Sequence, residues 1–311
     1  MFIKDNSAWI DVESACRLFG LSRSAYYEWW ANEDARIKAA IEYARLGIQI
    51  ELLFYRCKRR YGARRITDEL FKCGIKCSYD KVTKIMQDKK LVPIGHKKYK
   101  VTTTNSNHKY KVFDNLLSRN FTVDKPNQVY VGDITYIRTL EGWLYLAVVI
   151  DLYSRKVIGY KMSNRMTKDI VISALLDALK ARGYPKGVIV HSDRGSQYAS
   201  NEYKRILKQY ELQGSMSKKG DCWDNAVAES FFASLKKEYV HHVLFPTRTH
   251  AQLGIFDYIE AWYNNERSHS TIGRLSPNEF EKINQNKFVN DSKNMKFRKL
   301  VKNNFIGASM S

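Results

Sequence analysis

Cysteine, proline and long apolar segments are all scarce in this sequence. Its 311 residues include 5 Cys and 5 Pro, and the cysteines are odd in number and widely scattered. Such cysteines are typical of reduced thiols in a cytosol and argue against a disulfide framework. The longest apolar run, Leu144 to Ile150, is far shorter than the roughly 20 residues that a membrane-spanning helix needs. The N-terminal residues MFIKDNSAW lack the apolar core of a signal peptide, so we expect a cytoplasmic protein.

Several common catalytic motifs are also missing. The sequence has no Walker or dinucleotide-binding glycine loop and no Gly-x-Ser-x-Gly elbow. Cys73 and Cys77 could share a helix face, but no CxxC or HxxxH partner accompanies them, which argues against a zinc site. His191 beside Ser192 is better explained as the end of a strand than as half of a nucleophilic pair.

Acidic residues are the scarcer of the two charges. The 52 Lys and Arg against 32 Asp and Glu give a formal net charge of +20 and a pI near 9.6. A chain this basic is most simply explained by a polyanionic partner. A membrane surface is the alternative, but no basic amphipathic helix or lipidation signal favours it.

Residues 1–35 are predicted to form a short helical segment. Apolar residues at helical spacing begin near Val12, and Gly20 ends that helix. Ser22 can cap a second helix that extends to Trp30. Two short helices joined at a glycine resemble part of a helix-turn-helix, and a small helical hairpin used for packing explains them equally well.

Residues 36–92 are predicted to be all-helical, with a long first helix and a last helix capped by Ser78. Three helices with a glycine turn before the last favour a helix-turn-helix DNA-binding domain. Between Phe54 and Lys111 the sequence has 17 Lys and Arg against 4 acidic residues, which indicates a phosphate-binding surface. The candidate DNA contacts in this region are Arg59, Arg60, Arg64, Arg65, Lys81, Lys84, Lys97 and Lys98.

Residues 126–285 are predicted to be an α/β core, which follows a basic linker over 93–125 and precedes a basic tail over 286–311. The core opens with three runs of period-two alternation, VYVGDITYI, WLYLAVVID and RKVIGYKM, which predict an antiparallel meander. Two further strands then alternate with helices, so we expect a mixed five-stranded sheet with helices on both faces. A long helix over 249–265 and a polar arm, YNNERSHSTIGRLSPNEF, complete the core.

Three acidic residues in the core are candidate ligands for a metal ion. Asp133 lies in the middle of an apolar strand, where a carboxylate is costly unless a cation compensates it. Asp193 directly follows the strand GVIVHS, at the end of the sheet where ligands collect in α/β folds. Glu229 lies among small and aromatic residues on a predicted helix. Asp221 or Asp224 can cap the first turn of this helix. Asp151 is interpreted as a turn residue.

Two acids from one sheet and one from a helix packed on it form an all-oxygen site. Hard cations such as Mg²⁺ or Mn²⁺ prefer this ligation. Two such ions would activate water or a sugar hydroxyl and stabilise the leaving oxygen in a phosphoryl transfer. The basic composition agrees with this chemistry. A basic chain that holds DNA above these carboxylates needs the metal ions, because phosphate and carboxylate otherwise repel each other.

Asp133 in GDITYI, Asp193 in HSDRGSQYAS and Glu229 in GDCWDNAVAESFFASLK, with 35 residues between the last two, resemble the Asp-Asp-Glu triad of the retroviral-integrase superfamily. More narrowly, the chain is similar to the OrfB transposase of insertion-sequence family three. The likeness extends to YGARRITDEL, to Lys236 seven residues after Glu229, and to YNNERSHSTIGRLSPNEF, and it covers nearly the whole chain.

The resemblance implies an RNase H-like core in which Asp133, Asp193 and Glu229 bind two divalent metal ions. It implies a polynucleotidyl transferase that cleaves DNA at the terminal inverted repeats of an insertion sequence and transfers the strand into target DNA. Lys236 would contact the terminal DNA. The further candidates near this site are Trp223 and Asn225 as supporting residues and Lys218, Lys219 and Lys237 as DNA contacts.

The resemblance also implies that the partners are transposon ends and target DNA, bound by a homo-oligomer in the bacterial nucleoid. The family's active enzyme is usually a frameshift fusion with an upstream helix-turn-helix and leucine-zipper protein, so part of end recognition is expected outside this chain. Unlike retroviral integrases, the chain has no His-His-Cys-Cys zinc module at its N-terminus. A non-catalytic DNA-binding regulator and an RNase H-type nuclease stay open as alternatives.

Overall fold

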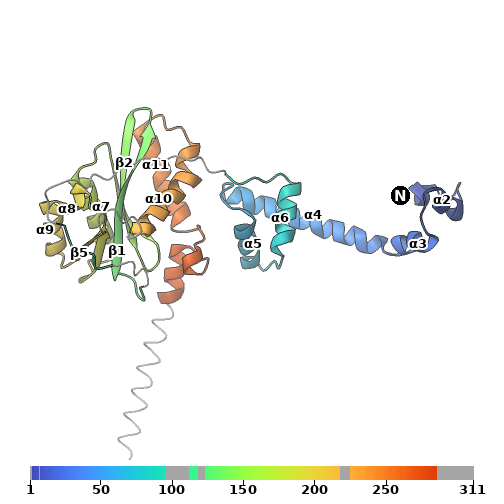
Figure 1. Cartoon of the computed structure of the whole chain (residues 1–311), viewed down its shortest axis with the longest axis horizontal. Coiled ribbons are helices and arrows are strands. Elements are labelled where there is room, and N and C mark those ends of the chain that lie inside the picture. The colour runs from blue at the N-terminus through green and yellow to red at the C-terminus, as the bar shows by residue number, and fades with distance from the viewer. Residues whose placement is uncertain (1, 7, 95–111, 118–122, 218–224, 286–311) are drawn as a thin grey trace, which may run out of the picture. The chain divides into compact units, whose positions relative to one another are not determined.

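The computed structural model describes residues 2–6, 8–94, 112–117, 123–217 and 225–285, and these divide into two compact units. The first unit, Met1–Ile94, is helical, and the second, Gly95–Ser311, contains the sheet (Figure 1). The predicted tail over 286–311 and much of the predicted linker lie outside the described residues. Within the described part of the chain, no helix is long and apolar enough to cross a membrane.

The first unit begins with three short helices, α1 (Phe2–Asp5), α2 (Val12–Leu18) and α3 (Arg23–Ala31). The Asp11 carboxylate caps α2 by accepting hydrogen bonds from two first-turn amides at 3.0 and 2.8 Å. Gly20 then adopts a φ of +64°, and the Ser22 hydroxyl caps α3 by accepting from the Ala25 amide at 3.1 Å. The predicted glycine turn and Ser22 cap are thus confirmed.

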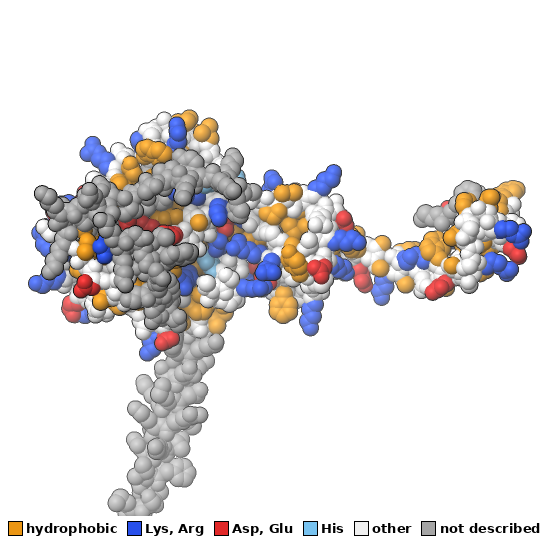
Figure 2. All heavy atoms as spheres, in the orientation of Figure 1, with side chains coloured by type: hydrophobic (Ala, Val, Ile, Leu, Met, Phe, Trp, Pro, Cys, Tyr) orange, Lys and Arg blue, Asp and Glu red, His pale blue; other side chains and the backbone are white. Residues whose placement is uncertain are grey.

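Three longer helices complete this unit, α4 (Glu33–Arg56), α5 (Ala63–Lys72) and α6 (Tyr79–Asp88). Ser78 caps α6 as predicted, accepting from the Lys81 amide at 3.3 Å. Buried apolar side chains hold the three helices together, Leu46, Ile50, Leu53, Phe54, Ile66, Leu70, Val82 and Ile85. α4 is apolar on a second face as well, where Ile41, Ile48 and Leu52 are exposed. Figure 2 shows hydrophobic side chains at the surface of the helical unit.

The second unit is built on a mixed five-stranded sheet in the order β3-β2-β1-β4-β5. The strands are β1 (Val129–Thr139), β2 (Gly142–Asp151), β3 (Val157–Ser163), β4 (Ile189–Ser192) and β5 (Gln213–Met216). The first three strands form the predicted antiparallel meander, and β4 and β5 add in parallel to the other side of β1. This arrangement confirms the predicted mixed sheet.

Helices pack on the sheet and carry the remaining core. They are α7 (Lys168–Ala181), α8 (Ser196–Ala199), α9 (Asn201–Gln209), α10 (Ala226–Glu238) and α11 (Arg248–Asp257), with the short 3₁₀ segments η2 (Val240–His242) and η4 (Ser270–Ile272). α7 packs against β2 and β3, while α10 packs against β1. The helix predicted over 249–265 is present but is not α-helical throughout, because α11 passes directly into a π-helical segment, η3 (Tyr258–Tyr263). π-Helical turns are intrinsically rare, and this one is held by side-chain contacts to α10 that are described below.

The segment predicted as a polar arm is instead packed into the second unit. Asn264, Arg267, Ser268, His269 and Ser276 are all buried. The Asn264 side chain accepts a hydrogen bond from the Val157 amide and donates one to the Val157 carbonyl, both at 3.0 Å, at the start of the edge strand β3. The prediction was wrong because these polar groups have partners inside the protein, which removes most of the cost of burying them.

Gly159 in β3 lets α7 approach the sheet closely. A Cβ atom at this position would lie 2.3 Å from the Ala174 carbonyl oxygen and 2.5 Å from the Ala178 amide nitrogen of α7. Because both neighbours are backbone atoms, the helix itself would have to move. We therefore expect Gly159→Ala to lower the free energy of unfolding by about 3 kcal/mol, measured by urea denaturation.

Gly47→Ala is the matched control for this substitution. Gly47 lies inside α4, and its added Cβ would meet only the flexible ends of the Lys89 and Ile85 side chains. Alanine is the better helix former by up to about 1 kcal/mol, so this variant should be as stable as the wild type or more so. Equal losses in the two variants would contradict the close approach of α7.

Candidate active site

The sheet places Asp133 and Asp193 next to each other. β1 and β4 pair in parallel from Val129 opposite Ile189 to Gly132 opposite Ser192, and the two aspartates are the next residues on the two strands. β4 ends at this point, and ligands bind at the carboxyl ends of strands in open α/β sheets. Both carboxylates are half-buried.

Short-range hydrogen bonds orient these two carboxylates. The Asp133 Oδ1 accepts from the Ile134 amide at 2.8 Å. The Asp193 Oδ1 accepts from the Gly195 amide at 2.9 Å, in the turn that leads into α8. The buried ring of Tyr198 lies behind them, close to Gly132 of β1. Backbone amides therefore stabilise both charges, but they satisfy only part of the oxygen lone pairs.

Glu229 is brought to the same region by α10. This helix buries Ala228, Phe231, Phe232 and Leu235 and leaves Glu229 exposed in its first turns. The sequence predicted a carboxylate in a costly place, and protein atoms around it do raise the pKa of Glu229 by desolvation. Its side chain nevertheless lies at the rim of the site rather than inside it.

The three acids influence one another electrostatically. Burial raises the pKa of Asp133 well above its usual value, and the negative charge of Asp193 raises it next. The Ile134 amide opposes this shift, the charge of Glu229 adds to it, and the nearby Lys236 ammonium lowers the pKa. Negative charge thus accumulates where the protein supplies only partial compensation, which is the environment that a bound cation would relieve.

The donor set fits a hard divalent cation in its chemistry, since carboxylate oxygens are the ligands that Mg²⁺ and Mn²⁺ prefer. The three side chains do not form a closed metal cage, however. Among the described residues, no group of three or more His, Cys, Asp and Glu side chains is arranged to hold a metal ion. Asp133 and Asp193 are in place for such a site, and Glu229 is within their electrostatic reach.

Lys236 lies between the acids and the hairpin of β1 and β2. Its ammonium is 4.8 Å from the centre of the Tyr136 ring, and burial lowers its pKa while the Asp133 charge opposes that shift. Asn225 is buried at the start of α10, and its Oδ1 has no hydrogen-bond partner among the described residues. Lys237 lies on the exposed face at the end of the same helix.

Several predicted residues cannot be compared with the structure. Trp223, the candidate caps Asp221 and Asp224, and the basic residues Lys97, Lys98, Lys218 and Lys219 lie outside the described residues.

Buried ion pairs hold together the elements around the site, and no sequence pattern had indicated them. Asp151, at the end of β2, accepts from the Asn127 and Tyr153 amides at 3.1 Å, so it does organise the turn as predicted. Its carboxylate is also fully buried and lies 3.2 Å from the Arg182 guanidinium, which in turn pairs with Glu281. Because these partners are far apart in the chain, no local pattern could have identified them.

A second buried cluster ties α10 to η3. The Glu238 carboxylate accepts from the Tyr258 hydroxyl at 3.0 Å and from the Trp262 indole at 3.1 Å. The buried Arg267 guanidinium lies 2.9 Å from the same carboxylate and also donates to the Ser234 hydroxyl at 2.9 Å. These contacts anchor the end of the helix that carries Glu229 and Lys236.

The basic residues predicted to bind DNA differ in how far they are exposed on the first unit. Arg59, Arg64, Lys81 and Lys84 are exposed, and the last two lie one turn apart on α6. Arg65 is half-buried with its guanidinium 5.1 Å from the centre of the Tyr61 ring. Arg60 is also half-buried, with two of its guanidinium nitrogens shielded from solvent. The exposed four are therefore the better candidates for phosphate contacts.

Comparisons with known proteins find family matches in both compact units. Residues 42–99 match the family model of an HTH-like domain, and residues 123–222 and 229–284 match two models of the integrase core domain. The transposase InsF of insertion sequence IS3A from Escherichia coli (strain K12) is 43% identical over 285 residues, which cover 91% of this chain and 98% of InsF. A 31 kDa protein of insertion element IS600 from Shigella sonnei is also 43% identical, over 87% of this chain and 98% of its own length.

Among solved structures, the catalytic core domain of HTLV-2 integrase in complex with magnesium aligns with 50% of this chain and 96% of its own. Its TM-score is 0.39 and its sequence identity is 18%.

The integrase core matches and the mixed sheet define a polynucleotidyl transferase with the predicted RNase H-like fold, preceded by a helix-turn-helix region. More narrowly, the chain belongs to the IS3 family of transposases, because it shares 43% identity with InsF over nearly the full length of both proteins. The predicted family, fold class and enzyme class are therefore confirmed.

Proposed function

We propose that this transposase cleaves DNA at the terminal inverted repeats of an insertion sequence and transfers the freed strand into target DNA in a metal-dependent reaction. The observation that supports this most directly is the pairing of β1 with β4, which sets Asp133 beside Asp193 where β4 ends. A nuclease core that also carries an HTH-like domain is suited to act at chosen ends rather than along any duplex.

In this proposal Asp133, Asp193 and Glu229 are the catalytic acids, and together they hold Mg²⁺ or Mn²⁺. The bound ions, two in number, would activate the attacking hydroxyl and stabilise the leaving oxygen. Asp133 and Asp193 are oriented for this role by the amides of Ile134 and Gly195. Glu229 would complete the set from the exposed first turn of α10.

Lys236 is proposed to hold a phosphate of the terminal DNA close to Asp133, with which it interacts electrostatically. Asn225 would support the site from the start of α10, and Trp223 is proposed as a second supporting residue. On the helix-turn-helix unit, Arg59, Arg64, Lys81 and Lys84 would make phosphate contacts that position the DNA. Further contacts are proposed at Arg60, Arg65, Lys97, Lys98, Lys218, Lys219 and Lys237.

The functional division of the chain follows from these roles. We propose a helical segment over 1–35, a DNA-binding domain over 36–92, a basic linker over 93–125, the catalytic core over 126–285 and a basic tail over 286–311. The protein would act as a homo-oligomer on DNA in the bacterial nucleoid. An upstream-frame helix-turn-helix and leucine-zipper protein, or a frameshift fusion with it, would share in end recognition.

The reaction products separate this function from its two alternatives. The purified full-length chain is incubated with a labelled duplex of the inverted repeat that flanks its gene and with plasmid DNA. With Mg²⁺ or Mn²⁺ we expect a nick at the 3′ end of the repeat and a labelled strand joined to the plasmid, and with EDTA we expect neither.

The other outcomes would each contradict the proposal. Binding of the repeat without any cleavage, both by this chain and by its fusion with the upstream-frame protein, would indicate a DNA-binding regulator. Cleavage that never yields joined products, or that ignores the sequence of the end, would indicate a nuclease.

A further inference from the structure

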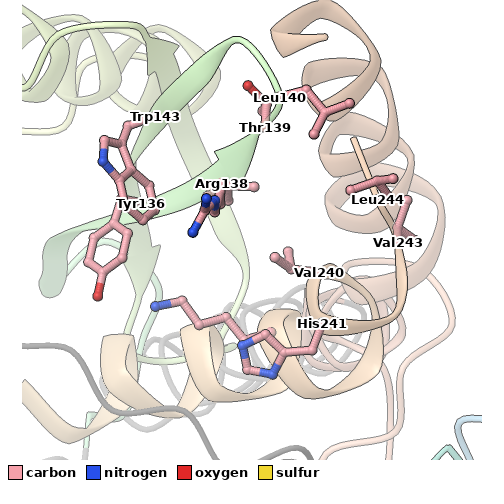
Figure 3. A pocket seen from close by; sticks show the side chains of 11 residues that line it. Tyr136, Arg138, Thr139, Leu140, Trp143, Val240, His241, Val243 and Leu244 are labelled. Atoms are coloured by element: carbon pink, nitrogen blue, oxygen red, sulfur yellow. The ribbon is translucent and has the colours of Figure 1, made fainter. Parts of the chain in front are cut away.

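A pocket of about 290 Å³ lies beside the candidate active site, between the β1–β2 hairpin and the segment that follows α10 (Figure 3). It combines aromatic, aliphatic and cationic side chains. Tyr136 and Trp143 form one end, Leu140, Val243 and Leu244 form the other, and the Arg138 side chain lies between them. Its volume is at the small end of the range of about 300–1,000 Å³ that is usual for ligand sites, so it fits a single small group.

The aromatic end of the pocket is well ordered by its own packing. The Tyr136 and Trp143 rings pack edge to face, with centroids 5.0 Å apart and planes at 89°. Tyr136 is buried, while 40% of Trp143 stays exposed. An indole that is held rigidly and remains open to solvent offers a surface on which a planar group can stack at little entropic cost.

Positive charge lines the same space. Arg138 is exposed, and Lys236 reaches the pocket from α10 with its ammonium over the Tyr136 ring. Lys236 also interacts with the Asp133 carboxylate, so one wall of the pocket is shared with the candidate active site. A ligand held here would therefore have one end within reach of the catalytic acids.

The sheet leaves this side of the hairpin accessible. β4 pairs with β1 only from Val129 to Gly132, and among the described residues no strand continues that pairing beyond Asp133. The part of β1 that borders the pocket, Tyr136 to Thr139, lies beyond this pairing. A chain leaving the active site along this edge would meet Tyr136, Arg138 and Trp143.

We propose that this pocket binds one unstacked nucleotide of the substrate DNA, with its base against Trp143 and its phosphate near Arg138 and Lys236. The inference rests on the proposed function and specifies it, because it requires the DNA end to be frayed by at least one base at the active site. The apolar walls favour a base, whereas the two cations favour the phosphate that is attached to it. A peptide would use the apolar walls but has no need of both cations.

The full-length protein is titrated with a short duplex ending in one unpaired nucleotide whose base is the fluorescent analogue aminopurine. A matched duplex carries the same base in a pair, and EDTA prevents cleavage. We expect the protein to quench the unpaired base and not the paired one, since stacking on an aromatic ring quenches this fluorophore. Trp143→Ala should weaken binding of the unpaired end by about tenfold and that of the paired duplex by less than about twofold.

Three further variants make the test specific. Trp143→Phe keeps an aromatic ring and should retain the quenching. Arg138→Ala, which removes an exposed side chain and leaves the fold intact, should weaken binding of the unpaired end by about fivefold. Tyr184→Ala removes an exposed aromatic residue that stacks on Tyr210 and takes no part in the pocket, so it should bind both duplexes like the wild type.

Wild-type quenching in both Trp143→Ala and Arg138→Ala would overturn the proposal, and so would an equal loss of binding for both duplexes. If Trp143→Ala fails to fold, Arg138→Ala and Trp143→Phe decide the outcome. The proposed function is judged separately by the wild-type products. Joined DNA together with unaffected pocket variants would reject the pocket alone. Absence of cleavage by the wild type, both alone and fused to the upstream-frame protein, would reject the function.

Discussion

Asp133→Asn is expected to lower metal-dependent cleavage and joining of the terminal repeat by about 10³-fold or more, while the protein stays folded. The amide has nearly the shape of the carboxylate but cannot supply the negative charge that binds a divalent cation. Asp193→Asn and Glu229→Gln should have losses of similar size, because the three side chains would act on the same ions. Gel analysis of nicked and joined products measures these rates.

Thermal stability provides a second test, because substitution of a residue with a purely structural role would not give the result expected here. Without metal, Asp133 is a half-buried carboxylate beside two others, so its charge destabilises the fold. Asp133→Asn should therefore melt at the same temperature as the wild type or higher. Added Mg²⁺ should raise the melting temperature of the wild type and leave that of the variant unchanged. At one hundred times its dissociation constant, the ion should add about 2.7 kcal/mol to the wild-type free energy of unfolding.

Glu202→Gln is the matched control, because Glu202 is a partly exposed carboxylate on α9 that pairs with Lys168. An exposed pair of this kind contributes about 0–1 kcal/mol, and its loss should affect neither the rate nor the response to metal. Retention of activity in Asp133→Asn, or an equal Mg²⁺ response in all variants, would remove these acids from the mechanism.

Arg182→Met is expected to lower the free energy of unfolding by about 3–5 kcal/mol. Arg182 has a side chain that is only 13% exposed, lies 3.2 Å from the Asp151 carboxylate and donates to Glu281 through both of its terminal nitrogens. Removing the guanidinium leaves two buried carboxylates without their shared cation. Urea denaturation followed by circular dichroism measures the loss.

The same variant should respond to pH in a defined direction. Burial raises the pKa of Asp151 from 3.8 to about 6 even with Arg182 present, whereas Arg182, Ser154 and Lys156 lower the pKa of Glu281 against its burial. The surrounding cations and hydrogen-bond donors therefore stabilise the charge of Glu281 more than that of Asp151. An acid with a raised pKa takes up a proton on folding, so its ionisation destabilises the protein as the pH rises through that window. Lowering the pH from neutral towards about 5 should thus recover part of the stability that Arg182→Met loses.

Lys186→Met tests whether any loss of a cation has this effect. Lys186 pairs with Glu211 at 2.6 Å, but both side chains are largely exposed. Its removal should cost no more than about 1 kcal/mol and should not create a new pH dependence. A loss for Arg182→Met as small as this would show that the buried pairs contribute little.

Patterns within short stretches of sequence were enough for much of the fold. Period-two alternation located the meander, and the cap at Ser22, the cap at Ser78 and the turn at Gly20 were all confirmed. These features depend on the backbone and on side chains within a few residues, so they can be predicted from residues that are adjacent in the sequence. The family could be recognised for a related reason, since its motifs are short.

Contacts between distant residues settled the rest. Both faces of α4 are apolar, and only packing with α5 and α6 selects the face of Leu46 and Ile50 for burial. Asn264 was assigned to a polar arm because nothing near it in the chain shows that Val157 satisfies its amide. The Arg182 pairs and the pocket at Trp143 join segments that are remote in sequence. Burial is a property of the assembled surfaces, and a residue's immediate neighbours do not reveal which surface will cover it.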